Sequence, residues 1–217
     1  MPPPPLHGGL LVGGASRRFG RPKALVEVGG TTLAERAAVV LATAVERLVL
    51  LGDGPVPDSL GALPRLADAA ETTGPLAGLL AALRSAPEAA WVICPCDLPW
   101  VTPQAVAWLA GERRPGRAAV LPRVPPDGPP EPLFALYEPA ALALVEALAG
   151  DGAPAPRRLA GRPGVAVVDL PAALAECWRD ADTPLELITG TDRTHRATTT
   201  TDVTAVTDPS GPRRRLR

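Results

Sequence analysis

The chain has 217 residues and a mass of 22.4 kDa, with 46% apolar and 21% charged side chains and a formal net charge of −1. This length suits one domain, and the charge excludes the broad basic field that is typical of nucleic-acid-binding proteins. No apolar run approaches the ~18 residues of a membrane span, and residues 1–5, Met-Pro-Pro-Pro-Pro, lack the pattern of a signal peptide. Because three cysteines, an odd number, exclude a disulfide framework, we expect a cytoplasmic protein.

Short apolar runs alternate with helical patterns from about residue 6 to residue 188. Strands are predicted at residues 10–12, 48–51, 91–94, 118–121, 133–137 and 165–168, and helices at residues 33–44, 75–85, 102–110 and 139–149. Thr32 and Glu35 form a capping-box pattern before the first helix, and a loop is expected at residues 123–132. This alternation predicts βαβ crossovers and therefore an α/β fold: a three-layer α/β/α sandwich with a mostly parallel sheet.

The last 29 residues have a different composition, with nine Thr, six Arg and three Asp. Such a segment buries too little apolar surface to offset the entropy of ordering it. We therefore expect a globular domain at residues 1–188 and a disordered Thr/Arg-rich tail at residues 189–217.

A glycine- and arginine-rich segment follows the first predicted strand directly: residues 11–25 read Leu-Val-Gly-Gly-Ala-Ser-Arg-Arg-Phe-Gly-Arg-Pro-Lys-Ala-Leu. Glycines let backbone N–H groups approach a phosphate closely, and four cationic side chains lie in the same segment. Of the 22 basic residues, 21 are Arg and only Lys23 is Lys, which indicates that position 23 needs a compact, flexible charge. Since neither the P-loop nor the dinucleotide-binding pattern is present, the segment predicts a polyphosphate site of another kind.

Asp97 lies just past the predicted strand at residues 91–94, in the sequence Cys-Pro-Cys-Asp-Leu-Pro. Mg²⁺ binds one or two carboxylates together with substrate phosphate oxygens, so Asp97 is a candidate magnesium ligand. The alternative is that Asp97 caps the next helix. No Cys or His pair accompanies Cys94 and Cys96 to complete a zinc site. Both histidines lie near the chain ends, so no Ser–His–Asp or Cys–His set is available, and charge stabilisation is favoured over covalent catalysis.

Together these segments resemble the molybdenum cofactor guanylyltransferases, the MobA family of nucleotidyltransferases. The family pattern Leu-x-Gly-Gly-x-Ser-x-Arg-x-Gly-x-x-Lys-x-Leu matches residues 11–25, and Gly-Pro-Leu-x-Gly matches residues 74–78. Cys-x-Cys-Asp-x-Pro matches residues 94–99, and Leu-x-Ala-Leu-Tyr matches residues 133–137. The family's Asn-x-Asn-Thr-Pro stands here as Asp-Ala-Asp-Thr-Pro at residues 180–184, and Leu51 precedes Gly52-Asp53 where the family often has Asn. The resemblance covers roughly residues 8–188.

The resemblance implies a Rossmann-like fold, Mg²⁺ as cofactor, and transfer of GMP from Mg-GTP to the terminal phosphate of molybdenum-molybdopterin. The products would be molybdopterin guanine dinucleotide and pyrophosphate. By position, Lys23 matches the phosphate-binding lysine, Asp68 an acidic nucleotide contact and Asp97 the magnesium ligand. The nucleotide-binding segment after the first strand comprises Leu11, Val12, Gly13, Gly14 and Ser16. Other molybdenum cofactor biosynthesis proteins are possible partners, and neither a nucleic acid nor a membrane is expected as one.

An ionised acceptor phosphate needs no general base to attack the α-phosphorus of GTP. We therefore expect catalysis by positioning and by charge neutralisation, from Lys23, Arg18 and a magnesium ion at Asp97. Three alternatives stay open: a cytidylyltransferase acting on the same pterin, another small-substrate nucleotidyltransferase, and a non-catalytic nucleotide-binding regulator. The Gly13-Gly14 pair favours guanylyl transfer, since the cytidylyl relatives tend to have Ala before the second Gly. Our hypothesis for the acceptor side is that Arg157 and Arg158 balance the charges of Asp180 and Asp182.

Overall fold

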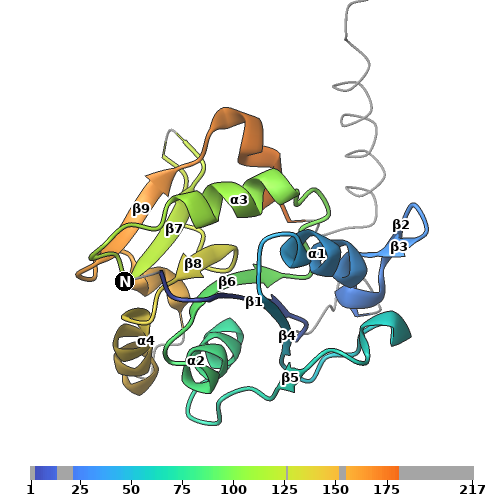
Figure 1. Cartoon of the computed structure of the whole chain (residues 1–217), viewed down its shortest axis with the longest axis horizontal. Coiled ribbons are helices and arrows are strands. Elements are labelled where there is room, and N and C mark those ends of the chain that lie inside the picture. The colour runs from blue at the N-terminus through green and yellow to red at the C-terminus, as the bar shows by residue number, and fades with distance from the viewer. Residues whose placement is uncertain (1–2, 14–21, 126, 152–154, 181–217) are drawn as a thin grey trace, which may run out of the picture.

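The computed structural model of the chain describes residues 3–13, 22–125, 127–151 and 155–180 (Figure 1). The predicted tail at residues 189–217 lies outside the described residues, as do Gly14, Ser16, Arg18 and Asp182. In the described ranges, no helix has both the length and the apolar character needed to cross a membrane.

Seven strands form one sheet in the described part of the chain, in the order β5-β4-β1-β6-β8-β7-β9. Their bounds are β1 (Leu6–Leu11), β4 (Arg47–Leu51), β5 (Arg65–Leu66), β6 (Ala90–Pro95), β7 (Ala119–Arg123), β8 (Ala135–Tyr137) and β9 (Val165–Asp169). Strand β8 is antiparallel to both of its neighbours, and every other pairing in the sheet is parallel. The prediction of a mostly parallel sheet is confirmed.

Among the described residues, four α-helices cover the two faces of this sheet (Figure 1). Helices α1 (Leu33–Ala42) and α3 (Pro103–Gly111) pack on one face, and α2 (Pro75–Ser85) and α4 (Ala141–Gly150) pack on the other. Successive strand residues point to opposite faces, so that Leu50 joins the α1/α3 core and Leu51 the α2/α4 core. This is the predicted three-layer α/β/α sandwich, with one apolar core on each side of the sheet.

Short elements connect the larger ones. A hairpin of β2 (Glu27–Val28) and β3 (Thr31–Thr32) precedes α1, and 3₁₀ helices occupy η1 (Lys23–Leu25), η2 (Asp58–Leu60), η3 (Pro156–Leu159) and η4 (Ala172–Trp178). The capping box before α1 is confirmed, because the Thr32 hydroxyl accepts from Glu35 N and the Glu35 carboxylate accepts from Thr32 N. The two-residue elements were not predicted, since two residues are too few to give a periodic pattern.

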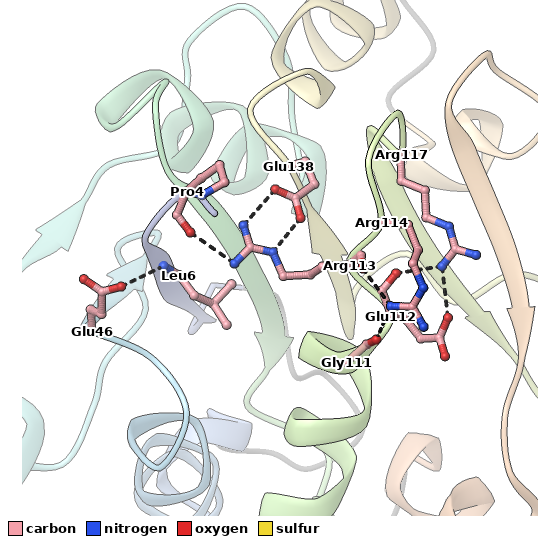
Figure 2. Close-up of polar contacts among 9 residues, drawn as sticks. All are labelled: Pro4, Leu6, Glu46, Gly111, Glu112, Arg113, Arg114, Arg117 and Glu138. Atoms are coloured by element: carbon pink, nitrogen blue, oxygen red, sulfur yellow. Dashed lines mark hydrogen bonds and ion pairs between the residues drawn. The ribbon is translucent and has the colours of Figure 1, made fainter. Parts of the chain in front are cut away.

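Ion pairs and hydrogen bonds from arginines stabilise the amino edge of the sheet (Figure 2). Arg113 donates to both carboxylate oxygens of Glu138, at 2.6 and 2.9 Å, and to the carbonyl oxygen of Pro4 at 3.1 Å. Arg114 donates to backbone carbonyls at the end of α3, and Arg117 pairs with Glu112. These arginines satisfy carbonyls and carboxylates of the fold itself, at the edge where the parallel strands begin.

Candidate functional site

Three neighbouring strands end level with one another at the carboxyl edge of the sheet. Leu11, the last residue of β1, is in register with Leu51 of β4 on one side and with Pro95 of β6 on the other. The chain stays in place one residue further, because Val12 N donates to Leu51 O at 3.0 Å and Cys96 N donates to Leu11 O at 3.1 Å. Ligands of parallel α/β sheets bind beyond this edge, so the segments that follow β1, β4 and β6 form the candidate site.

Lys23 and Asp97, which are 74 residues apart in sequence, meet at this edge. The Nζ of Lys23 donates to Oδ2 of Asp97 at 2.8 Å, and the two side chains are only 17% and 24% exposed. Lys23 begins η1, which is anchored because Ala24 and Val26 are buried. Such a partly shielded, charge-assisted contact is stronger than an exposed one. The structure therefore places a cation and a carboxylate side by side where β6 ends.

Asp97 does not cap the following helix. The N-cap of α3 is Thr102, whose hydroxyl accepts from Ala105 N at 3.3 Å. The helix-cap interpretation of Asp97 is therefore wrong, and its carboxylate faces Lys23 instead.

The donor set at Asp97 fits magnesium. In the described ranges no group of three His, Cys, Asp or Glu side chains lies close enough to enclose a metal ion. Mg²⁺ usually takes one or two protein carboxylates and completes its octahedron with phosphate oxygens and water. The carboxylate of Asp97, at the end of β6, suits this kind of shared site.

The two cysteines beside Asp97 are unsuited to nucleophilic chemistry. Cys94 and Cys96 are both buried, and burial, followed by the charge of Asp97, raises the pKa of Cys96 to about 12. Burial also raises the pKa of Cys94. The reactive form of cysteine is the thiolate, so these thiols stay neutral and pack in the core.

Asp68 follows the short edge strand β5 and lies against the ends of β4 and α2. A Cβ at position 52 would lie 3.5 Å from Asp68 Oδ1, and a Cβ at position 78 would lie 3.4 Å from it. The Cβ at position 78 would also come within 2.8 Å of the Leu11 side chain. Desolvation and, secondly, the charge of Asp53 raise the pKa of the Asp68 carboxyl. Asp68, Asp53 and the end of β1 therefore share the β5 side of this edge.

A glycine turn after β4 lies over the end of β1. A Cβ at position 54 would lie 1.8 Å from the carbonyl oxygen of Val12, so only glycine fits there. Arg65 holds the turn, because its Nη1 donates to Gly52 O at 2.7 Å and to Gly54 O at 2.9 Å. The role of Arg65 was not predicted: the Gly-Asp-Gly sequence directly after a predicted strand indicates the turn but not the side chain that holds it.

The opposite side of the site carries a mixed-charge group. Arg157 pairs with Glu131 at 3.2 Å. The pKa of Glu131 is raised overall, mainly by burial; Arg157 lowers it, and the charge of Asp180 adds a smaller increase. The guanidinium of Arg179 lies 3.9 Å from the ring centroid of Trp100, in the loop that follows β6. Residues 179–180 therefore lie beside the loop that carries Asp97, on the side away from β5.

Comparison with known proteins identifies the family. Residues 8–167 match the model of the MobA-like NTP transferase domain. A molybdenum cofactor biosynthesis bifunctional protein of Synechocystis is 36% identical over 143 residues, which are 64% of this chain and 41% of that protein. A probable molybdenum cofactor guanylyltransferase of Opitutus terrae is 38% identical over 148 residues, 65% of this chain and 70% of that protein. The chain thus spans less than half of the Synechocystis protein.

Solved structures share the fold. Molybdopterin-guanine dinucleotide biosynthesis protein A of Archaeoglobus fulgidus has a TM-score of 0.69 at 24% identity, covering 88% of this chain and 99% of that one. The 2-C-methyl-D-erythritol 4-phosphate cytidylyltransferase of Thermus thermophilus has a TM-score of 0.58 at 20% identity, covering 86% of this chain and 98% of that one. At these identities the structures support the Rossmann-like α/β architecture alone. The family model matches residues 8–167, which is more than half of this chain. The chain therefore belongs to the MobA-like NTP transferase family of nucleotidyltransferases.

Proposed function

We propose that the chain transfers GMP from Mg-GTP to the terminal phosphate of molybdenum-molybdopterin, releasing pyrophosphate and forming molybdopterin guanine dinucleotide. The observation that carries the proposal is the Lys23–Asp97 pair at the carboxyl edge, beside the strand end that opens the glycine-rich segment. Family membership supports nucleotidyl transfer, and the names of several curated relatives support the guanylyl donor and the pterin acceptor.

In this proposal the backbone after β1 binds the nucleotide. Leu11, Val12 and Gly13 lie at the strand end, and Gly14 and Ser16, outside the described residues, continue that segment in the sequence. Asp68 lies on the same edge and contacts the nucleotide from the β5 side.

Lys23 supplies positive charge to the phosphates while the acceptor phosphate attacks the α-phosphorus in line. The acceptor oxygen forms a bond to phosphorus as the bond to the leaving pyrophosphate breaks, and Lys23 stabilises the charge that develops there. We assign the same role to Arg18, which lies outside the described residues. Asp97 would hold Mg²⁺, which supplies Lewis-acid neutralisation of phosphate charge when bound.

The acceptor is proposed to bind beside Arg157. Arg157 pairs with Glu131, whose pKa is also affected by the charge of Asp180. A cation therefore lies where this chain carries carboxylates in place of the family's asparagines. We further propose a cytoplasmic setting, because all three cysteines are free and buried in the folded chain, which suits a reducing compartment. Other proteins of molybdenum cofactor synthesis are the expected partners.

Nucleotide-dependent stabilisation tests the proposal. The melting temperature is measured with Mg²⁺ and GTP, CTP, ATP or UTP, and pyrophosphate release is then followed with molybdenum-molybdopterin as acceptor. We expect GTP to bind at least about tenfold more tightly than CTP, about 1.4 kcal/mol, and to support turnover. Equal binding of both would move the assignment to the cytidylyl branch, and binding without turnover would indicate a regulator.

A further inference from the structure

The turn at residues 52–54 is more tightly constrained than a surface turn needs to be. Gly52 has a φ of +90°, and its N–H donates to Leu66 O at 2.9 Å. Gly54 approaches the Val12 carbonyl so closely that a Cβ would overlap it. The turn is therefore fixed against the strand end that carries the proposed nucleotide contacts.

One arginine fastens both ends of this turn from the neighbouring strand. Arg65 is in register with Leu50 across the β4–β5 pair, and a single Nη1 donates to the carbonyls of Gly52 and Gly54. Both hydrogen bonds are charge-assisted, so they hold the backbone orientation more firmly than neutral ones. Because Asp53 lies between the two carbonyls, Arg65 fixes the backbone on either side of that carboxylate.

Asp53 and Asp68 come from different strand ends but act on each other. The charge of Asp53 contributes to the raised pKa of Asp68, and Asp68 Oδ1 lies beside Gly52. A guanine base offers two adjacent donors, N1–H and N2–H₂, whereas the cytosine edge offers one, N4–H₂. One carboxylate on each of these two adjoining segments matches the two donors of guanine, and sites built from hydrogen-bond partners discriminate strongly against bases that leave them unpaired.

We propose that Arg65 is a positioning residue for nucleotide recognition, which fixes the turn at residues 52–54 so that Asp53 and Asp68 together accept the donors of a guanine base. This inference rests on the proposed guanylyl transfer, in which Asp68 already contacts the nucleotide, and extends it to Arg65 and Asp53, which the family pattern does not include. Arg65 does not touch the nucleotide; it acts through the turn.

The test measures the dissociation constants of Mg-GTP and Mg-CTP for the full chain. The melting temperature is measured on the same variants, and KM and kcat are measured in the pyrophosphate-release assay. In Arg65→Met we expect the Kd for GTP to rise about tenfold and the GTP/CTP preference to fall, with kcat at saturating GTP within about threefold of the wild type. Arg65→Lys should restore part of the preference, because an ammonium can donate to both carbonyls. Asp53→Asn, which leaves the arginine in place, should lower the preference without lowering the melting temperature.

Arg114→Met is the matched control, since Arg114 also donates through one Nη1 to two backbone carbonyls, at the opposite edge of the sheet. It should alter neither nucleotide affinity nor preference. Wild-type GTP affinity and preference in Arg65→Met would overturn the positioning role, and wild-type preference in Asp53→Asn would overturn the base-reading role. If the wild type binds GTP and CTP equally, the guanylyl proposal fails, and the positioning role then requires that both dissociation constants still rise in Arg65→Met. Should Arg65→Met not fold, Arg65→Lys and Asp53→Asn decide by the same measurements.

Discussion

Asp97→Asn removes a negative charge from the carboxyl edge of the sheet while keeping the size of the side chain. The pair that it weakens is a single half-buried contact of 2.8 Å, and Thr102 rather than Asp97 caps α3. The lost contact is worth about 1 kcal/mol, which lowers the melting temperature of a domain of this size by about 2–4 °C. Folding should therefore survive the change.

Turnover should fall much further than stability. If Asp97 holds Mg²⁺ against the triphosphate, loss of its charge costs at least about 2.7 kcal/mol of transition-state stabilisation, or about a hundredfold in rate. Pyrophosphate release is the assay, with Mg²⁺ titrated at saturating GTP. The variant should need more Mg²⁺ for its half-maximal rate as well as turning over more slowly.

Glu112→Gln provides the control for a lost carboxylate. Glu112 pairs with Arg117 at 2.9 Å and is 22% exposed, close to the values for Asp97, but it lies at the opposite edge of the sheet (Figure 2). It should show a similar change in melting temperature and full turnover. Full Mg²⁺-dependent turnover in Asp97→Asn would refute the metal assignment, and an equal loss of turnover in both variants would show that the effect is structural.

Substitution also tests Lys23, two glycines at the carboxyl edge and the partly buried imidazole of His7. Lys23→Arg should lower turnover at least tenfold in the pyrophosphate assay despite keeping the charge, because a planar guanidinium does not replace a compact ammonium at a half-buried contact of 2.8 Å; wild-type turnover would refute this. Gly54→Ala should lower the free energy of unfolding in urea by about 1–3 kcal/mol, since its Cβ overlaps the Val12 carbonyl. A Cβ at position 13 has nothing within 4 Å among the described residues, so Gly13→Ala should leave the free energy of unfolding unchanged. It should weaken GTP binding, and an unchanged GTP affinity would argue against a backbone contact between Gly13 and the nucleotide. Burial, then the charge of a nearby arginine, lowers the pKa of His7, whose Nδ1 has no partner among the described residues, so protonation favours the unfolded chain. Stability from His7 is therefore full above pH ~6.5 and is lost as the pH falls toward the lower folded pKa; the loss, seen as a falling urea midpoint, should be smaller in His7→Phe.

Local patterns predicted most of the fold because its elements are long, buried and capped. The strand expected at residues 91–94 is found as Ala90–Pro95, and the helix expected at residues 75–85 begins and ends at those residues. A run of buried apolar residues marks the first, and a proline in the first turn marks the second. Such signals depend only on neighbours in sequence.

The antiparallel direction of β8 could have been predicted from the sequence but was not. Between β7 and β8 the sequence shows a proline- and glycine-rich loop at residues 123–132 and no helix. A parallel return needs a crossover of a dozen or more residues, usually helical, so a connection of this length brings the chain back antiparallel. The result is the reversed β8 between β6 and β7.

The partners of the site residues depend on topology, which local patterns do not contain. The composition already distinguished Lys23 and the strand-end position distinguished Asp97, but their contact requires β1 and β6 to be neighbours. The role of Arg65 is harder still to predict, because its partners are two carbonyl oxygens of a turn in which Gly52 has a positive φ. A side chain that binds backbone leaves no complementary residue in the sequence to reveal the pairing. Residues of this kind are therefore found only once the turn they hold has been placed against the strand end that binds the ligand.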